Sequence, residues 1–354
     1  MIRAAFLGCY TDGAGGQGSG IVVAQRDPAT GGLRDPVVVA RTPSPSFVAG
    51  HADILYAVNE LDEGGLTAFR VHDDLSLTEL GRWPTGGAFP CHVAVDPGAG
   101  TVVVSNYGSG SVATYPIGPD GVPVGRGDLV AHHGHGKHPD RQEGPHAHSA
   151  TPTPDGLLSV DLGVDTVYRY RVDPLTGATG EGTPMLQLRA GTGPRHLVHT
   201  GHTMYVAGEL NDTITSFSGT DGQWHETGTV AASVAPDAAP SEVAVAGRYL
   251  YVANRGPDTI SVFDTGSFDA GSFEAGSFDA GSGSLVRVGE VSTGGSWPRH
   301  FAIADGFLYV ANERSHTVVT FALDPTTGLP VPTGDVLRTP SPTCVLPWPP
   351  PAVL

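Results

Sequence analysis

The chain has 354 residues, among them 50 glycines and 30 prolines, and only 16% of its residues are charged. Glycine and proline both interrupt helices, and long helices need charged outer faces, so this composition excludes a mainly helical protein and favours an all-β protein with many turns. A net charge of −17 with a single lysine argues against a partner such as nucleic acid or an anionic membrane.

The three cysteines are an odd number at no metal-like spacing, which predicts reduced core thiols in a cytoplasmic protein; they are Cys9, Cys91 and Cys344. The apolar start over residues 1–7 is too short for a secretory signal, and no apolar run approaches membrane-spanning length. We therefore expect a cytoplasmic protein that binds no membrane and no nucleic acid, and that is a monomer or a weak homodimer.

Short β-like segments recur along the chain, and each series begins at a proline. Six such prolines follow one another at steps of 45 to 58 residues: Pro45, Pro90, Pro145, Pro194, Pro240 and Pro298. In the fourth unit we expect strands over residues 194–199, 203–207 and 213–217. The fifth and sixth units repeat this pattern, with strands over residues 240–245, 249–253, 259–263, 298–302, 307–311 and 317–321.

The two ends of the chain complete one another. A seventh proline stands at Pro342, and its approach, residues 338–342, repeats residues 41–45 letter for letter. That unit lacks its remaining strands, which residues 4–8 and 20–24 can supply. We therefore predict an all-β, seven-bladed β-propeller with four-stranded antiparallel blades, one blade being shared by the N- and C-termini, in a single domain over residues 1–354.

A low-complexity insertion, residues 265–284, interrupts the fifth unit and contains a repeated Gly-Ser-Phe pentapeptide. The predicted topology puts it in a turn between third and fourth strands, on the face away from the site described next. We interpret it as a tolerated surface insertion, with a contact surface built on its three phenylalanines as the alternative.

Two columns of residues vary from unit to unit and are expected on the same face, near the central axis. One column follows the prolines: Ser46, Cys91, His146, Arg195, Ser241, Arg299 and Thr343. The other lies at the tips of the second strands: Glu60, Tyr107, Leu162, Glu209, Arg255, Glu313 and Tyr10. Together they bring one histidine, three arginines and three glutamates to one mouth. The alternative is chance clustering of solvated surface charge.

The histidines fall into three groups. His146 shares its column with Arg195, which favours a role in the pocket, whereas His148 stands where other units are apolar, so both a core role and a catalytic role stay open. We expect structural packing for His92, His196 and His300. The histidines of residues 132–138 have no carboxylate or cysteine at ligand spacing, so we predict no metal and no other cofactor.

A family resemblance rests on repeats such as Pro-Arg-His at 298–300 with Tyr-Val-Ala-Asn-Glu at 309–313, and above all on the third unit. That unit carries Arg141-Gln142, the stretch Pro145-His-Ala-His-Ser149 and Asp161-Leu-Gly-Val-Asp165. The whole chain resembles the propeller-type 6-phosphogluconolactonase family, whose relatives include the fungal 3-carboxymuconate-lactonizing enzyme. The resemblance implies that Glu209 is an acidic catalytic residue and that Arg195 and Arg255 clamp the substrate.

The first functional hypothesis is metal-independent hydrolysis of an anionic sugar lactone. Such ring opening needs a base for water, a cation beside the carbonyl oxygen and anchors for the rest of the substrate. The catalytic candidates are His146 with Glu209 as the base that activates water, Arg195 at the oxyanion, and His148. The substrate-binding candidates are Arg255, Arg299, Arg141, Gln142, Glu60, Asp161 and Glu313, of which Asp161 can also orient a histidine.

Two alternatives remain. A muconate-type cycloisomerase, or another cyclase of acidic small molecules, uses the same set with a proton donor in place of the base. A non-catalytic propeller would present this face to a protein. No serine nucleophile elbow and no phosphate-cradling glycine loop is found in the sequence, which argues against covalent acyl chemistry and nucleotide use.

Overall fold

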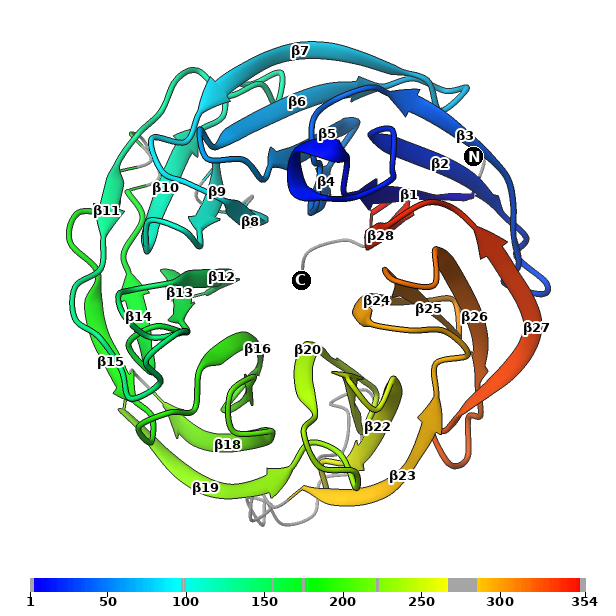
Figure 1. Cartoon of the computed structure of the whole chain (residues 1–354). Coiled ribbons are helices and arrows are strands. Elements are labelled where there is room, and N and C mark those ends of the chain that lie inside the picture. Colours follow the sequence, from blue (N-terminus) through cyan, green and yellow to red (C-terminus); the bar gives the residue numbers. More distant parts are fainter. Residues whose placement is uncertain are drawn as a thin grey trace, which may run out of the picture.

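The computed structural model describes residues 3–96, 98, 100–154, 156–173, 176, 178–220, 223–266 and 285–350. Within these residues, seven four-stranded antiparallel sheets surround a central axis (Figure 1). The predicted seven-bladed β-propeller is confirmed. The insertion predicted at 265–284 falls almost wholly outside the described residues. The one short helical turn in the described chain is η1 (Asp12–Ala14), and no helix there is long and apolar enough to cross a membrane.

The first three blades follow the chain from the axis outward. Blade 1 consists of β4 (Val48–His51), β5 (Ile54–Asn59), β6 (Gly65–Val71) and β7 (Leu77–Pro84). Blade 2 consists of β8 (Pro90–Asp96), β9 (Thr101–Asn106), β10 (Ser111–Pro116) and β11 (Leu129–Ala131). Blade 3 consists of β12 (Ala147–Thr153), β13 (Gly156–Asp161), β14 (Thr166–Tyr170) and β15 (Thr183–Gln187).

The next three blades repeat this order. Blade 4 consists of β16 (Pro194–Thr200), β17 (Thr203–Gly208), β18 (Thr213–Thr220) and β19 (Gln223–Ala231). Blade 5 consists of β20 (Ala239–Ala246), β21 (Tyr249–Arg255), β22 (Thr259–Asp264) and β23 (Val286–Ser292). Blade 6 consists of β24 (Pro298–Ala304), β25 (Phe307–Asn312), β26 (Thr317–Leu323) and β27 (Pro330–Arg338).

Blade 7 is shared by the chain ends, as predicted. Its strands are β28 (Pro342–Trp348), β1 (Ala4–Cys9), β2 (Ile21–Arg26) and β3 (Leu33–Ala40), in that order from the axis. β1 pairs antiparallel with β28, so that Ala4 lies opposite Trp348 and Gly8 opposite Cys344. This pairing closes the ring, because it replaces two exposed strand edges by one continuous sheet.

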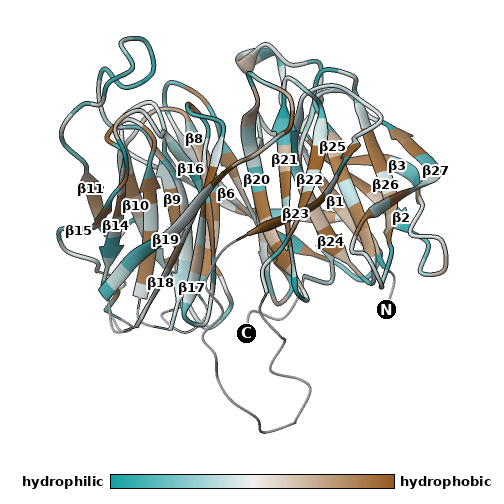
Figure 2. Ribbon diagram, turned by 90° about the horizontal axis from the view of Figure 1, so that it is seen from below, coloured by the Kyte–Doolittle hydropathy of each residue, from teal (hydrophilic) through white to brown (hydrophobic). Residues whose placement is uncertain are grey.

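The core lies between neighbouring blades, whose inner strands carry apolar side chains on both faces. Figure 2 shows hydrophobic residues along the strands and hydrophilic residues mainly in the loops of the two faces. Buried tyrosines also join neighbouring blades: the hydroxyl of Tyr115 donates to the carbonyl of Pro84 at 3.0 Å, and that of Tyr251 to the carbonyl of Gly328 at 2.8 Å. Each bond spares a buried hydroxyl the cost of lying unpaired.

The third blade corrects the alignment of the units. In blade 4, Pro194 lies opposite Gly208 and the N–H of Glu209 donates to the carbonyl of Gly193. In blade 3, Ala147 lies opposite Asp161 and the N–H of Leu162 donates to the carbonyl of His146. The equivalent of the anchor proline is therefore Ala147, and Pro145 precedes the strand. The column shared with Arg195 is occupied by His148, so assigning that position to His146 was wrong by two residues.

Candidate active site

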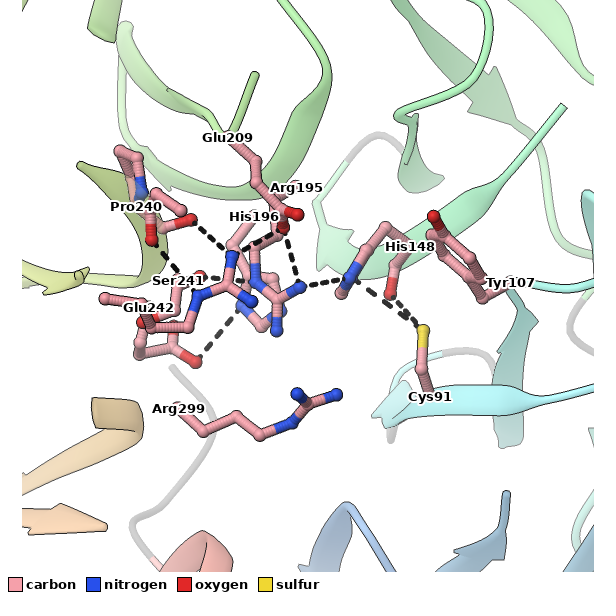
Figure 3. Close-up of polar contacts among 12 residues, drawn as sticks. Cys91, Tyr107, His148, Arg195, His196, Glu209, Pro240, Ser241, Glu242 and Arg299 are labelled. Carbon is pink, nitrogen blue, oxygen red and sulfur yellow. Dashed lines mark hydrogen bonds and ion pairs between the residues drawn. The ribbon is translucent and has the colours of Figure 1, made fainter. Parts of the chain in front are cut away.

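The starts of the first strands and the tips of the second strands meet on one face around the axis, as predicted. Figure 3 shows His148, Arg195, Glu209 and Arg299 pointing toward one another there. Each residue stands on a β-strand end that the blade packing fixes. These four side chains are preorganised, because they do not depend on flexible loops for their positions.

Glu209 gathers three arginines at the mouth. Its side chain is buried, and its Oε2 lies 2.9 Å from Nη1 of Arg195 and 2.7 Å from Nη2 of Arg255. Its Oε1 lies 2.7 Å from Nη2 of Arg141, which reaches in from the loop between β11 and β12. We call these four residues the Glu209 cluster. The cluster carries more positive than negative charge.

The cluster sets the charge state of its members. Burial opposes ionisation of Glu209, but the charges of Arg255, Arg195 and their neighbours outweigh it and hold the pKa of Glu209 well below its usual range. Burial also lowers the pKa of Arg255, to about 10, against the opposing effect of Glu209. At neutral pH, Glu209 is therefore a carboxylate and Arg255 a cation.

His148 joins the cluster through Arg195. Nη1 of Arg195 hydrogen-bonds to Nε2 of His148 while also contacting Glu209 (Figure 3). Because a guanidinium only donates, Nε2 accepts, and the proton of a neutral imidazole lies on Nδ1, 3.8 Å from Sγ of Cys91. Burial and the charge of Arg195 hold the pKa of His148 well below its usual range, so this imidazole is neutral.

His146 lies against Tyr107. The two rings stack with centroids 4.4 Å apart, and Nδ1 of His146 donates to the Tyr107 carbonyl at 2.9 Å. Its Nε2 lies 3.2 Å from the exposed carboxylate of Glu143. The hydroxyl of Tyr107 accepts from Arg141, so Tyr107 connects His146 to the Glu209 cluster.

Two predicted substrate-binding residues hold the scaffold of this loop. Asp161 is fully buried; one of its oxygens accepts from the backbone N–H of His146 and the other lies 2.6 Å from Nδ1 of His132. Asp161 thus orients a histidine, as expected, but it is His132. The amide of Gln142 accepts from the N–H groups of Lys137 and His138 and donates to backbone and Asp165. Both side chains are thus used within the protein.

Arg299 occupies the opposite side of the mouth. Its guanidinium lies 4.8 Å from the ring centroid of Tyr10, hydrogen-bonds to the Tyr10 hydroxyl and lies 3.4 Å from Oε2 of Glu313. The same hydroxyl donates to Oε1 of Glu60 at 2.9 Å. Oε2 of Glu60 has no hydrogen-bond partner within the described part of the chain. We call these four residues the Arg299 cluster.

A small cavity at the axis lies between the two clusters. Its lining residues are Ser46, Phe47, Glu60, Cys91, Arg195, His196, Arg299 and Thr343. Burial raises the pKa of the Cys91 thiol, so this cysteine stays protonated and is a poor nucleophile.

Beneath the cavity, three histidines pack around Phe47, whose ring centroid lies 4.4 Å from that of His92, 6.2 Å from that of His196 and 5.2 Å from that of His300. Oε2 of Glu242 lies 3.1 Å from His196 and 3.3 Å from His300. This agrees with the structural packing expected for these histidines. They form the floor of the mouth.

The histidine-rich loop contributes to packing. His132 is buried, stacks on Tyr168 with ring centroids 3.8 Å apart and hydrogen-bonds to Tyr170. Across the described ranges, no group of three histidine, cysteine or acidic side chains could hold a metal ion. The structure thus gives no support to a metal site in residues 132–138.

The sequence of this chain matches the profile of a known protein family. The profile of the family described as a lactonase with a seven-bladed β-propeller matches residues 4–347. The chain belongs to this lactonase family. The resemblance predicted from the repeats is confirmed, and with it the assignment to a family of hydrolytic enzymes.

Relatives match the lactonase-family chain along its whole length. The 6-phosphogluconolactonase of Bacillus subtilis (strain 168) is 32% identical over 360 residues, covering 96% of this chain and 97% of that protein. A solved structure from Lactobacillus plantarum has a TM-score of 0.87 and 30% identity, covering 98% and 100% of the two chains. The periplasmic gluconolactonase of Pseudomonas aeruginosa has a TM-score of 0.85 and 27% identity, covering 98% and 99%.

Three aromatic residues at the mouth of this lactonase-family propeller were not among the predicted site residues. Tyr107 and Tyr10 stood in the second-strand column and were passed over in favour of charged residues. Trp297 precedes the anchor Pro298 and lies under the guanidinium groups of Arg255 and Arg314. The usable signal was position: Tyr10 and Tyr107 stand in a column already recognised as facing the axis, and Trp297 directly precedes the anchor proline Pro298.

Proposed function

We propose that this chain hydrolyses a sugar lactone in the manner of a 6-phosphogluconolactonase. The observation that carries the proposal is the guanidinium of Arg195, which bridges Glu209 and His148 at the axis. It puts a fixed cation beside a neutral imidazole, the pair that ester hydrolysis by water requires. The names of the relatives support the same reaction: one is a 6-phosphogluconolactonase and another a gluconolactonase.

In the proposed reaction, water attacks the lactone carbonyl carbon. The carbonyl oxygen gains negative charge as the new C–O bond forms, and it accepts N–H donors from Arg195. The ring C–O bond then breaks, its electron pair leaves with the ring oxygen, and that oxygen becomes a hydroxyl by taking up the proton that the base removed from the attacking water. The product is the open-chain hydroxy acid, and the sum is the addition of one water.

His148 is the proposed proton acceptor. When the carbonyl oxygen takes the place of His148 as acceptor of an Arg195 N–H, Nε2 becomes free to receive a proton from water. Burial, and after it the charge of Arg195, lowers the pKa of His148 in the free protein. An oxyanion forming against Arg195 offsets that charge, so His148 becomes more basic as the reaction proceeds.

Glu209 has a positioning role in this proposal. Its carboxylate is engaged by three arginines and its pKa lies well below the usual range, so it is a weak base. Instead, it holds Arg195 in place and offsets part of the repulsion between the three arginines. The hypothesis that Glu209 activates water together with His146 is therefore replaced by one in which it organises the oxyanion site.

Cyclisation of an acidic substrate, the other catalytic hypothesis, needs a proton donor at this position. The neutral state of His148 works against that role, because a buried imidazole beside Arg195 resists protonation. Hydrolysis is the better supported reaction. A cytoplasmic location and a monomeric or weakly dimeric state stay predictions from the sequence.

The test compares the two histidines of the third blade. His148→Asn should lower kcat by about 100-fold or more with little change in KM, the usual scale for losing a general base. His146→Asn should lower kcat less, because His146 stacks on Tyr107 and lies beside Glu143, whereas His148 is the histidine bonded to Arg195. The measurement is acid release from D-glucono-δ-lactone and its 6-phosphate, corrected for spontaneous hydrolysis. Equal losses in both variants, or none in His148→Asn, would reject this assignment.

A further inference from the structure

Two residues that line the small cavity at the axis carry a buried polar atom without a partner. Oγ of Ser46 and Oε2 of Glu60 are both buried, and neither has a hydrogen-bond partner among the residues that the structure describes. Arg195 and Arg299 line the same cavity. A buried polar atom left unpaired costs free energy, so two such atoms at one cavity indicate a small ligand that hydrogen-bonds to both.

The backbone around Ser44 holds Ser46 and Glu60 together. The N–H groups of Ser46 and Glu60 both donate to the carbonyl of Ser44, at 2.8 and 3.0 Å. The carbonyl of Ser46 also accepts from Oγ1 of Thr343 at 2.8 Å. Oε1 of Glu60 accepts from the hydroxyl of Tyr10 at 2.9 Å. The two side chains are therefore fixed relative to one another, and Oγ and Oε2 remain for a ligand.

The size and charges of the cavity select this ligand. Its volume is about 10 Å³, which is close to the room that one water molecule needs. The charges of Arg195 and Arg299 oppose a cation there, and the carboxylate of Glu60 opposes an anion. Water suits both groups, because it can donate to Glu60 and accept from a guanidinium, while the hydroxyl of Ser46 can do either. The cavity is therefore suited to one water molecule.

This cavity adjoins the proposed reaction centre. Figure 3 shows the guanidinium groups of Arg195 and Arg299 and the thiol of Cys91 around the same space. Two of these walls also contact His148: Nη1 of Arg195 bonds to its Nε2, and Sγ of Cys91 lies 3.8 Å from its Nδ1. Water in the cavity therefore lies beside the arginine at which the lactone carbonyl is proposed to bind, and the proposed base contacts two walls of the cavity.

We propose that this cavity holds the water molecule that attacks the lactone, and that Glu60 and Ser46 are the residues that position it. The inference rests on the proposed lactonase function and adds the source of the nucleophile. The water oxygen bonds to the carbonyl carbon, one of its protons passes to Nε2 of His148, and the other stays hydrogen-bonded to Glu60. Oε2 has two lone pairs, so it can accept from this water and from a sugar hydroxyl together. A water fixed in advance avoids much of the entropy cost of a collision from the solvent.

The first test compares substitutions in the cavity, with D-glucono-δ-lactone as the substrate. In Glu60→Gln, the amide oxygen can keep the bond from Tyr10, and the amide nitrogen then replaces the acceptor Oε2 by a donor. We expect kcat to fall about tenfold or more while KM stays within about twofold, as for the loss of one charge-assisted hydrogen bond. Ser46→Ala should lower kcat about fivefold, the scale of a neutral hydrogen bond.

Ser159→Ala is the matched control for these variants. Ser159 of β13 is also a buried serine whose hydroxyl has no partner in the described part of the chain, but it is not among the residues that line the cavity. Its kcat should equal that of the wild type. Equal losses of kcat in Glu60→Gln and Ser159→Ala would overturn the inference.

Methanol distinguishes water held in the cavity from water taken from the solvent. Methanol attacks esters as water does, but it is too large for a cavity of about 10 Å³. In aqueous methanol the wild type should therefore yield gluconic acid and no methyl ester beyond that of the spontaneous reaction. Ser46→Gly enlarges the cavity, so methyl gluconate should then form. Methyl ester from the wild type in proportion to the added methanol, or none from Ser46→Gly, would contradict the proposal.

A crystal structure of the wild type provides a readout that does not depend on turnover. It should show one ordered water about 3 Å from both Oγ of Ser46 and Oε2 of Glu60. If this water is present but the protein opens no lactone, the proposed function fails and the water site stands. If the cavity holds no water in a map that resolves ordered waters nearby, the inference is wrong, whatever the activity.

Discussion

Both sides of the mouth contain arginine and glutamate, but arginines outnumber glutamates on one side and glutamates outnumber arginines on the other. In the Glu209 cluster, three arginines surround one carboxylate, and these side chains come from blades 4 and 5 and from the loop that leads into blade 3. In the Arg299 cluster, one arginine faces Glu313 and a tyrosine that is itself bonded to Glu60, and these side chains come from blades 6, 7 and 1. The axis thus separates a cationic side from an acidic one.

The difference suggests a division of labour in the proposed reaction. Negative charge develops on the lactone carbonyl, and the cationic side is where it would be stabilised. Sugar hydroxyls are hydrogen-bond donors, and Glu60 offers Oε2, which within the described chain has no partner. A lactone bound across the axis would meet donors at one end and acceptors at the other, which fixes its direction.

The largest effect is expected from removing the carboxylate of Glu209. Glu209→Gln leaves three arginines without their shared carboxylate, and loss of one partner of a buried ion pair costs about 3–5 kcal/mol. We expect a fall of that size in the free energy of unfolding by denaturant, together with a large loss of kcat as Arg195 loses its position.

The matched variant on the acidic side is Glu313→Gln. Because Arg299 keeps Tyr10, and Glu60 lies behind that tyrosine, we expect a stability change of only about 1 kcal/mol. Removal of a negative charge should also lower KM for an anionic lactone by a few-fold. Similar losses in both variants would show that the two sides are not different in kind.

Arginine substitutions give a smaller, kinetic contrast. Arg255→Ala removes a cation that contacts both Glu209 and Trp297, so KM for an anionic lactone should rise about tenfold or more. Arg299→Ala removes a cation already offset by Glu313, so its KM should rise less. Steady-state kinetics on the same lactone measure both. A larger rise in KM for Arg299→Ala than for Arg255→Ala would show that the anionic substrate depends more on the Arg299 cluster than on the Glu209 cluster.

The smallest effect expected is on the pH profile. The pKa of His148 is held well below its usual value of about 6.5, so the base stays neutral as the pH falls from 7 through that value. The acid limb of kcat/KM should therefore lie below pH 6.5. A limb near 6.5 or above would point to a solvated histidine as the base.

Much of this architecture follows from sequence periodicity alone. Each unit repeats a strand pattern, so the order of the blades could be predicted. The same pattern predicted that residues 4–8 and the segment after Pro342 share one blade, and that Arg195 and Glu209 lie on the same face. Facing residues follow from topology, because the start of one strand and the tip of the next lie on the same face. The site residues that stand at repeated positions of the blades can thus be predicted from the sequence.

The rest depends on contacts that no period encodes. Pro145 has the sequence spacing of an anchor proline. The strand register shows instead that Ala147, opposite Asp161, occupies the anchor position of blade 3. Arg141 reaches Glu209 from an irregular loop that Gln142 and Asp165 hold in place. Such loop positions result from many long-range bonds. The residue type of Gln142 suggested substrate binding, whereas its hydrogen bonds give it a structural role.

The closure of blade 7 by β28 and β1 also orders events during synthesis. The partner of β1, the strand β28 (Pro342–Trp348), is made about 330 residues after β1, and at about 5–20 residues per second this interval lasts roughly 17–67 s. Throughout that interval β1 has one edge unpaired. For most of the same interval Tyr10, at the tip of β1, also lacks its neighbour Arg299. The ring around the mouth can therefore close only once β28 has been made, so a chain that terminates before β28 carries most of the site residues without a closed ring.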